Sequence, residues 1–545
     1  MADDPSHGPV CIVWFKRDLR TVDHAALHAA SARGRVLCLY IAEPDVVTAP
    51  DFAPRHWTFL RHSLLELRDR LTALGGGLMV RSGDAVSVLE SLRRAYGPRI
   101  ELFSHEETGN AVTFARDRAV RRWCRECGVP WHEFRQFGVI RGLKDRTGWA
   151  RRWEAFMFAP TLPEPAALRW ASVSPDQWGD LPTHADLGLA ADATRHTHTP
   201  GRATGLRLLE TFLAARGQHY HEHLSSPLTA WDGCSRLSPY IAYGNVSLRE
   251  VVQATRRRRA DIAAGRHRPG TDDVANAADP SAAAWRKALY MFDARLHWHC
   301  HFMQKLESEP RIEFENFVPA LTGLREPHFS RERFDAWAAG QTGYPMVDAV
   351  MRCLHATGWI NFRMRCLVMS FAAYDLFLHW REPALHLARL FTDYEPGIHY
   401  PQAQMQSGTT GINTLRMYSP VKQGYDHDPE GDFVRRWVPE LADVPQPYIH
   451  EPWTAPSPPT GYPRPVVNHE TAVAAARAAF AAWRRRPDVR AQADAVLERH
   501  GSRRAGLPQV RRPAGRGRPA NSRIAPSRKT APPTETASLF DSDDA

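Results

Sequence analysis

Five short apolar runs alternate with helix-like segments over the first 135 residues, and this alternation constrains the fold more than any other feature of the chain. A β–α–β repeat places parallel strands in one sheet with helices on both of its faces. The expected strands are Val10–Phe15, Arg35–Ala42, Gly77–Arg81, Ile100–Phe103 and Pro130–Phe134. No GxGxxG motif follows the first strand, so a conventional dinucleotide fingerprint is absent. We therefore predict an α/β doubly wound parallel-sheet domain over residues 9–135.

The rest of the chain divides into a linker, a helical domain and a tail. Residues 136–200 are expected to connect two domains, with one helical piece at Trp149–Phe158 and a proline-rich remainder. Amphipathic segments from Gly201 onward predict an all-α domain over residues 201–490. Residues 491–545 are expected to form a basic, disordered tail. From residue 501 onward this tail holds nine Arg or Lys and four Asp or Glu, which is half of the net charge of +10.

The stretch from Gln341 to Leu441 carries the strongest sign of a ligand site. A first apolar helix is expected to open at Pro345 and to end at Gly358. A second, Asn361–Trp380, is apolar nearly all round, which predicts a buried helix. Two acids, Asp393 and Glu395, follow on a loop close to a helix that carries Arg365. Acid and base beside buried apolar helices indicate a bound polar ligand.

Several motifs of this stretch resemble the flavin domain of the cryptochrome/photolyase family. They are GYPMVDAVMRCL, HATGWINFRMR, HWRE, NTLRMYSP and DPEGDFVRRWVPEL, and WFKRDLR at Trp14–Arg20 resembles the opening of the family's antenna domain. The similarity covers roughly Pro9 to Pro447 and implies an FAD-binding helical domain. It also implies a blue-light-driven DNA photolyase that repairs UV-induced pyrimidine lesions by electron transfer from reduced flavin. The alternative is a cryptochrome-like photoreceptor without repair activity.

The resemblance assigns cofactor contacts residue by residue. Arg365 and Asp393 match the arginine–aspartate pair that flanks the isoalloxazine ring, and Glu395 matches a second acid on the same loop. His399 falls where many photolyases place an asparagine facing flavin N5, and a histidine there can exchange a proton near neutral pH. The segment that holds the pyrophosphate begins at Cys234, which replaces the usual threonine. The remaining cofactor contacts implied are Tyr220, Ser235, Arg236, Leu237 and Ser238; the alternative for the two serines is ordinary helix capping.

The resemblance also assigns residues that meet the lesion and the DNA backbone. Trp298 matches an aromatic residue that packs on the lesion, and Arg363 and Arg416 match arginines near the DNA backbone. Two positions depart from cyclobutane-dimer photolyases: Arg295 replaces a glutamate and Cys366 replaces a methionine. An arginine donates hydrogen bonds and cannot accept them as a glutamate does.

The family's electron route through three tryptophans is interrupted in this sequence. Trp380 matches the middle tryptophan, while the inner position falls at Ala403 and the outer one near Pro327. Tyr400, Trp359 or Trp437 are the alternatives that remain open for the missing steps.

In the family the antenna domain often holds a second, light-harvesting chromophore of varying identity. For this chain a flavin-type chromophore and no chromophore are the alternatives that stay open. Thr113 replaces a glutamate that accompanies a folate antenna in some members. The basic residues Lys16, Arg17 and Arg20 are expected on a solvated loop, paired with nearby acids.

Partners and location complete the expectations. The chain is expected to bind UV-damaged DNA as a cytoplasmic monomer, without a membrane segment or a metal ion. His297, His299 and His301 are spaced by two on a helix, so their side chains point to different faces rather than to one ion. The ending TASLFDSDDA resembles the short peptides that bind the bacterial sliding clamp.

Overall fold

A five-stranded parallel sheet forms the core of the N-terminal domain in the computed structural model, which describes residues 8–166, 168–195, 198–266 and 280–501. Its order is β3-β2-β1-β4-β5, so the predicted parallel sheet is confirmed. Because the order reverses between β1 and β4, the loops after these strands diverge and leave a crevice at their carboxyl ends. The strands are β1 (Val10–Phe15), β2 (Arg35–Ala42), β3 (Leu78–Ser82), β4 (Ile100–His105) and β5 (Trp131–Phe134).

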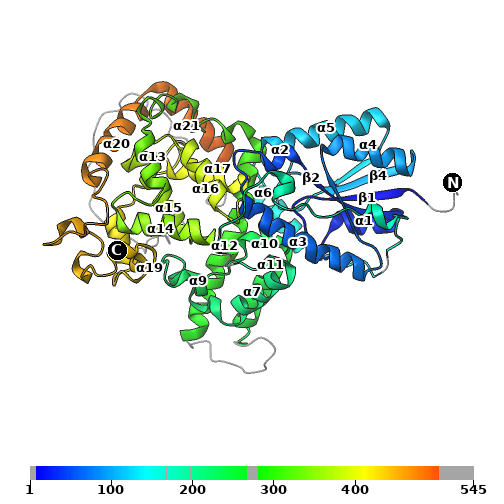
Figure 1. Cartoon of the computed structure of the whole chain (residues 1–545), viewed down its shortest axis with the longest axis horizontal. Coiled ribbons are helices and arrows are strands. Elements are labelled where there is room, and N and C mark those ends of the chain that lie inside the picture. Colours follow the sequence, from blue (N-terminus) through cyan, green and yellow to red (C-terminus); the bar gives the residue numbers. More distant parts are fainter. Residues whose placement is uncertain (1–7, 167, 196–197, 267–279, 502–545) are drawn as a thin grey trace, which may run out of the picture.

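Helices cover both faces of this sheet (Figure 1). On one face, Val13 and Phe15 of β1 pack with the apolar sides of α1 (Ala25–Arg33) and α3 (Pro54–Ala73). On the other face, the alternate β1 residues pack with α4 (Ala85–Tyr96) and α5 (Ala111–Cys127). Every residue of β1 is buried, as expected for a central strand covered on both sides. The short helix α2 (Pro44–Val47) follows β2.

The linker returns over the sheet domain and then enters the helical domain. Its one α-helix, α6 (Trp149–Phe158), has the predicted bounds. The helical domain lies beside the sheet domain and is larger (Figure 1). Its longest helix, α12 (Pro280–Ser308), packs along α11 (Leu248–Ala263) and α17 (Pro396–Gln406). The other helices before α20 are α7 (Arg202–Ala214), α8 (Tyr220–His223), α9 (Ala230–Gly233), α10 (Ser238–Ala242), α13 (Arg331–Ala338), α14 (Pro345–Thr357), α15 (Phe362–Ser370), α16 (Arg381–Leu390), α18 (Pro420–His427) and α19 (Asp432–Trp437).

The two central apolar helices differ in how well the sequence predicted them. The first is α14, which begins at Pro345 and is capped by Gly358 in the left-handed conformation. The second, expected over residues 361–380, is shorter. It is α15 followed by one π-helical turn, Phe371–Asp375, and the backbone then reverses at Phe377, where φ is +55°. Burial of this segment is as predicted, since its residues from Cys366 to Leu376 are all buried.

Two C-terminal helices extend the helical domain further than expected. Helices α20 (His469–Arg484) and α21 (Pro487–His500) bury Phe480, Val489 and Val496 in one apolar cluster with Phe317 and Tyr374. The expectation of a disordered tail was therefore wrong for residues 491–500. The rest of that tail, with its clamp-like ending, lies outside the described residues. Among the described residues no helix combines the length and the apolar character needed to cross a bilayer.

The two domains meet where the loop after β1 touches the turn after α10. Leu19 N donates to Tyr243 O at 3.2 Å, and Arg20 Nη1 donates to Gly244 O at 2.9 Å. Gly244 has a φ of +70°, and an added Cβ would lie 2.3 Å from Arg17 O and 2.4 Å from Asp18 Cα. The interface therefore depends on a glycine at this position.

We expect Gly244→Ala to weaken this interface strongly. Gly128 provides the control, because its φ is +68° and an added Cβ would meet nothing within 4 Å. Gly128→Ala is expected to cost roughly 1–2 kcal/mol for the left-handed backbone alone. Gly244→Ala is expected to cost about 1–3 kcal/mol more because two backbone atoms must move. Urea unfolding of both variants measures the difference, and equal costs would show that the contact is not rigid.

Candidate functional site

A cavity of about 310 Å³ lies inside the helical domain, between α10, α12, α15, α17 and the loop before α17. We call it the main cavity. All nine residues predicted to contact a cofactor line it: Tyr220, Ser235, Arg236, Leu237, Ser238, Arg365, Asp393, Glu395 and His399. Its walls are mainly apolar with a few polar groups, which is the usual character of a small-molecule site.

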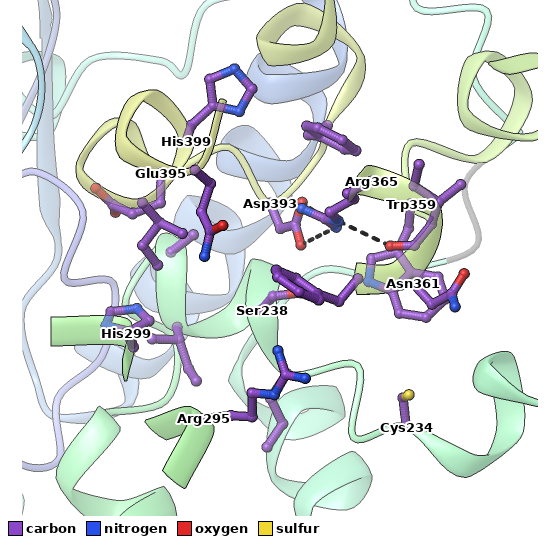
Figure 2. Close-up of a pocket in the computed structure, with 18 of the residues that line it drawn as sticks. Cys234, Ser238, Arg295, His299, Trp359, Asn361, Arg365, Asp393, Glu395 and His399 are labelled. Atoms are coloured by element: carbon purple, nitrogen blue, oxygen red, sulfur yellow. Dashed lines mark hydrogen bonds and ion pairs between the residues drawn. The ribbon is translucent and has the colours of Figure 1, made fainter. Parts of the chain in front are cut away.

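Arg365 and Asp393 form an ion pair at the wall of the main cavity (Figure 2). Arg365 Nη2 donates to both carboxylate oxygens, at 3.0 and 2.8 Å, and its guanidinium lies 4.1 Å from the Phe391 ring centroid. Arg365 Nε donates to Ile360 O, which fixes the side chain from the other side. Burial acts to raise the pKa of Asp393, but the charge and hydrogen bonds of Arg365 outweigh it and hold that pKa below its usual value. The pair is therefore charged and preorganised.

Glu395 is bound by a residue of the other domain. Arg17 Nη2 lies 3.3 Å from Glu395 Oε2 and donates to Tyr394 O at 2.8 Å, while Arg17 Nε donates to Ala242 O at 2.9 Å. Burial raises the pKa of Glu395, and the charge of Arg17 opposes this rise. The acidic loop of the main cavity is thus held in place from the sheet domain.

His399 is held as a neutral imidazole of one tautomer. Its Nε2 lies 2.8 Å from Ala384 O, and because a carbonyl can only accept, Nε2 carries the proton. Burial lowers the pKa of His399 to about 4. The lone pair on Nδ1 is therefore available as an acceptor at neutral pH.

The segment before α10 forms a further part of the main cavity wall. Arg236 has a φ of +56°, a strained conformation for a residue with a side chain, and its guanidinium lies 4.6 Å from the Trp231 ring centroid. Ser235 Oγ accepts from Leu237 N at 3.4 Å. Ser238 starts α10 and bonds to Asp393, so this segment is tied to the Arg365 pair.

Comparison with known proteins identifies the family. The sequence matches the DNA photolyase family over residues 11–140 and the FAD binding domain of DNA photolyase over residues 292–482. A deoxyribodipyrimidine photo-lyase of Vibrio cholerae is 30% identical over 481 residues, which cover 84% of this chain and 96% of that protein. The chain belongs to the DNA photolyase/cryptochrome family. Cryptochrome-2 of Arabidopsis thaliana is 29% identical over 85% of this chain and 77% of its own length. A solved photolyase of Sulfolobus tokodaii, described with two FAD molecules, has a TM-score of 0.70 and 25% identity, and the match covers 87% of this chain and all of that one.

The residues predicted to contact the lesion or the DNA backbone fall into two groups in the structure. Arg295 and Cys366 line the main cavity, and Arg295 lies 4.6 Å from the Phe362 ring centroid. Trp298, Arg363 and Arg416 do not line it. Trp298 meets the His301 ring edge to face and the Phe302 ring at a tilt, and Arg363 lies 5.7 Å from the Tyr418 ring centroid. Arg416 stands just before α18, where its carbonyl accepts from Ser370 Oγ.

Trp380 is fully buried and belongs to a chain of aromatic rings. Its Nε1 donates to Asn316 Oδ1, and its ring centroid lies 6.4 Å from that of Tyr400. Tyr400 in turn lies 6.4 Å from Tyr394, which lines the main cavity. Both hydroxyls donate to Asp51 of the sheet domain, at 2.5 Å from Tyr394 and 3.2 Å from Tyr400. These tyrosines stand between Trp380 and the cavity, whereas Ala403 offers no ring there.

A second cavity of about 110 Å³ lies between the two domains, and we call it the interdomain cavity. It occupies the crevice at the carboxyl ends of β1 and β4, and Thr113 and Tyr394 are among its lining residues. The expectation of a solvated basic loop was wrong. The Lys16 side chain is 8% exposed and pairs with Asp117 at 3.1 Å, and Arg20 is 2% exposed at the domain interface. Tertiary partners far along the chain, not solvent, satisfy these cations.

The three histidines of α12 face different surroundings. His297 contacts Trp149 and Trp153, His299 contacts Phe137 and lines the main cavity, and His301 contacts Trp298.

Within the described residues one cluster has metal-like composition: Asp18, His24 and His105, whose ligand atoms lie within 4.8 Å of one another. His24 Nδ1 accepts from Leu27 N, so Nε2 carries the proton toward Asp18, and His105 Nδ1 lies 2.6 Å from the same carboxylate oxygen. The cluster is held by the hydrogen bond of His105 and by a 3.0 Å contact between His24 Nε2 and Asp18 Oδ2.

Sequence reasoning missed several residues of the main cavity, above all Gln402 and Gln406. They share one face of α17 with His399 and Ala403, at the helical spacings of three and four residues. The helical spacing of both glutamines from His399, a predicted site residue, is the sequence signal that could have identified them.

Proposed function

We propose that this protein is an FAD-dependent DNA photolyase that uses blue light to repair UV-induced pyrimidine lesions. The observation that carries the proposal is the main cavity, where all nine residues assigned to the cofactor meet around the Arg365–Asp393 pair. The named photolyases among the relatives support the same function.

The residues of the main cavity fit FAD. Its apolar walls suit the ring system, the charged pair supplies a donor beside an acceptor, and Ser235 and Ser238 offer hydroxyls at the pyrophosphate end. When bound and reduced, FAD supplies the electron that light drives into the lesion, while the protein sets position, charge and dryness.

The chain's own residues perform the other tasks. The Arg365–Asp393 pair holds the local charge fixed, and neutral His399 presents a lone pair rather than a proton at neutral pH. Arg295 and Cys366 border the space left for the lesion, and Arg363 and Arg416 hold DNA phosphates. A lesion must leave the base stack to enter such a cavity, and Trp298 offers an aromatic surface outside it.

Photorepair of defined lesions tests the proposal. Duplexes with a single cyclobutane dimer or a single (6-4) lesion are incubated with the reduced protein under blue light or in the dark. We expect light-dependent loss of one lesion class. Flavin photoreduction without loss of either lesion would contradict repair and favour the photoreceptor function.

We propose that the interdomain cavity holds the second chromophore. It brings charged and aromatic side chains together at the switch point of the sheet, with Lys16, Arg17, Tyr40, Glu43 and Tyr243 in its wall. The photolyase described with two FAD molecules supports a second pigment in the family. Mass spectrometry of pigments released from the purified protein identifies it.

We expect Trp380→Phe to slow photoreduction of the bound flavin several-fold. Trp380 meets the cavity through Tyr400 and Tyr394, and a phenylalanine keeps the packing but is a far poorer electron donor. The loss of oxidised-flavin absorbance under blue light with an added thiol measures the rate. Trp123→Phe is the control, because Trp123 is buried in α5 of the sheet domain, in an apolar cluster that does not include Trp380. Equal rates in the two variants would exclude this route.

The compartment and the partners also belong to the proposal. All eight cysteines are unpaired, which supports a reducing compartment such as the cytoplasm. The monomeric state, the absence of a metal and the clamp contact of the tail stay predictions.

A further inference from the structure

Two glutamine side chains of α17 carry buried amide atoms without a partner. Gln406 is 4% exposed, and neither its Oε1 nor its Nε2 has a hydrogen bond. Gln402 Oε1 is also buried and has no hydrogen bond. Burial of an unpaired amide costs free energy, and proteins rarely leave one so. The neighbouring Gln404 shows the contrast. Its Nε2 donates to Ile312 O and Glu315 O, and its Oε1 accepts from Phe317 N.

These three unpaired amide atoms point to a ligand because both residues line the main cavity. They lie one helical turn apart on the face of α17 that also carries His399 and Ala403. An α-helix rises 1.5 Å per residue, so Gln406 stands about 10 Å further along the cavity wall than His399. The amides therefore face a different part of the cavity contents from the acidic loop at Asp393.

A primary amide offers a carbonyl acceptor beside an N–H donor. Two of them in a row complement an imide edge, in which an N–H stands between two carbonyls. Arg295, on the facing helix α12, adds donors only. Two sources of an imide edge are relevant: the pyrimidine ring of the flavin and a thymine-type base. The Arg365–Asp393 pair already supplies a donor and an acceptor to the cavity. The proposed function assigns that pair to the flavin, which leaves the amides for the base.

We propose that Gln402 and Gln406 read the imide edge of a thymine-type base in the lesion and thereby select the lesion. This inference rests on the proposed function, because it assigns the specificity of the same site. It makes the two glutamines specificity-determining residues for repair.

The test uses the flavin-loaded full chain in the dark. Fluorescence anisotropy compares an oligonucleotide that contains one thymine dimer with the undamaged oligonucleotide. We expect Gln402→Leu and Gln406→Leu each to lower the preference for the lesion by about tenfold, as loss of good base contacts does. Affinity for undamaged DNA stays unchanged, because phosphate contacts supply it. Met369→Leu is the control, since Met369 lines the same cavity without a polar group.

A change in the DNA provides a second measurement that no folding defect can mimic. A dimer methylated at both N3 atoms lacks the imide N–H, so the wild-type protein is expected to bind it about tenfold more weakly than the normal dimer. The leucine variants are expected to bind both dimers alike.

Two results would overturn the inference without affecting the proposed function. In the first, the leucine variants keep the wild-type preference for the lesion. In the second, the variants change flavin content and absorption while the preference for the lesion stays. The second result would assign the amides to the flavin. A wild-type protein that does not prefer the thymine dimer over undamaged DNA overturns the inference. The photorepair assay, which also includes the (6-4) lesion, decides the proposed function separately.

Discussion

Replacing Arg365 with leucine lowers the free energy of unfolding by about 3–5 kcal/mol and removes stable FAD retention, because it leaves a buried carboxylate without its partner. Only 2% of the Asp393 side chain is exposed, and Arg365 gives it two hydrogen bonds. Without Arg365, burial raises the pKa of Asp393, and the carboxyl group takes up a proton. The ligand then meets a neutral group in the variant, whereas it meets a carboxylate in the wild type. Urea unfolding and the ratio of flavin to protein absorbance measure the two effects.

A matched surface pair serves as the control for this variant. Arg331 and Asp335 pair across one helical turn of α13, with side chains 72% and 54% exposed. Exposed pairs of this kind contribute about 0–1 kcal/mol, so Arg331→Leu is expected to change little. Asp393→Asn is expected to retain more stability than Arg365→Leu, since it removes the buried charge itself. Equal stability losses for Arg365→Leu and Arg331→Leu would show that the cavity pair is not a structural ion pair.

Acid weakens the fold steeply between pH 6.5 and 4. Burial lowers the pKa of His56 and of His198 to about 4, and both side chains are nearly inaccessible. In the unfolded chain these groups titrate near 6.5, so below that pH the unfolded state binds more protons than the native state. Stability therefore rises with pH through this window and is lost on acidification. Each histidine contributes about 2 kcal/mol of loss between pH 7 and 5 by this linkage, against a total of roughly 5–15 kcal/mol for a typical domain.

One substitution isolates the contribution of a single histidine. Neither ring nitrogen of His198 has a hydrogen-bond partner, and the ring packs between Trp231, Tyr240 and Trp359. His198→Phe keeps an aromatic ring there and cannot take up a proton. Urea unfolding at pH 7 and at pH 5 is expected to show a smaller pH dependence for this variant, by about 2 kcal/mol. An unchanged slope would mean that His198 is protonated in the native state.

Much of the fold was predictable because its signals are local. The strand at Val10–Phe15 is an uninterrupted apolar run, and the helix from Pro345 to Gly358 carries its start and stop signals in its own sequence. The helix predicted to extend to Trp380 ends early, because the backbone at Phe377 adopts a left-handed conformation. A phenylalanine gives no sequence signal for that conformation. Composition alone also could not show that Val496, within residues 491–500, joins a buried apolar cluster of the helical domain.

The sequence predicted those parts of the site that depend on charged residues and on family motifs. Residue type and motif singled out Arg365, Asp393 and His399, and all three line the main cavity. Their roles toward a cofactor stay predictions. The bridge from Arg17 to Glu395 was missed, since the two residues are joined only by tertiary packing. The importance of Gln406 was equally hidden, because an orphaned amide is recognised only when its surroundings are known.

Because the sheet domain anchors the acidic loop, the parts of the main cavity are completed in a fixed order during synthesis. Arg17 and Asp51 reach Glu395, Tyr394 and Tyr400 from the part of the chain that leaves the ribosome first. The anchor for the loop is consequently ready before the residues that it fixes have been made. A helical domain produced alone would lack this anchor, so cofactor loading becomes a late event that waits for the two halves to dock.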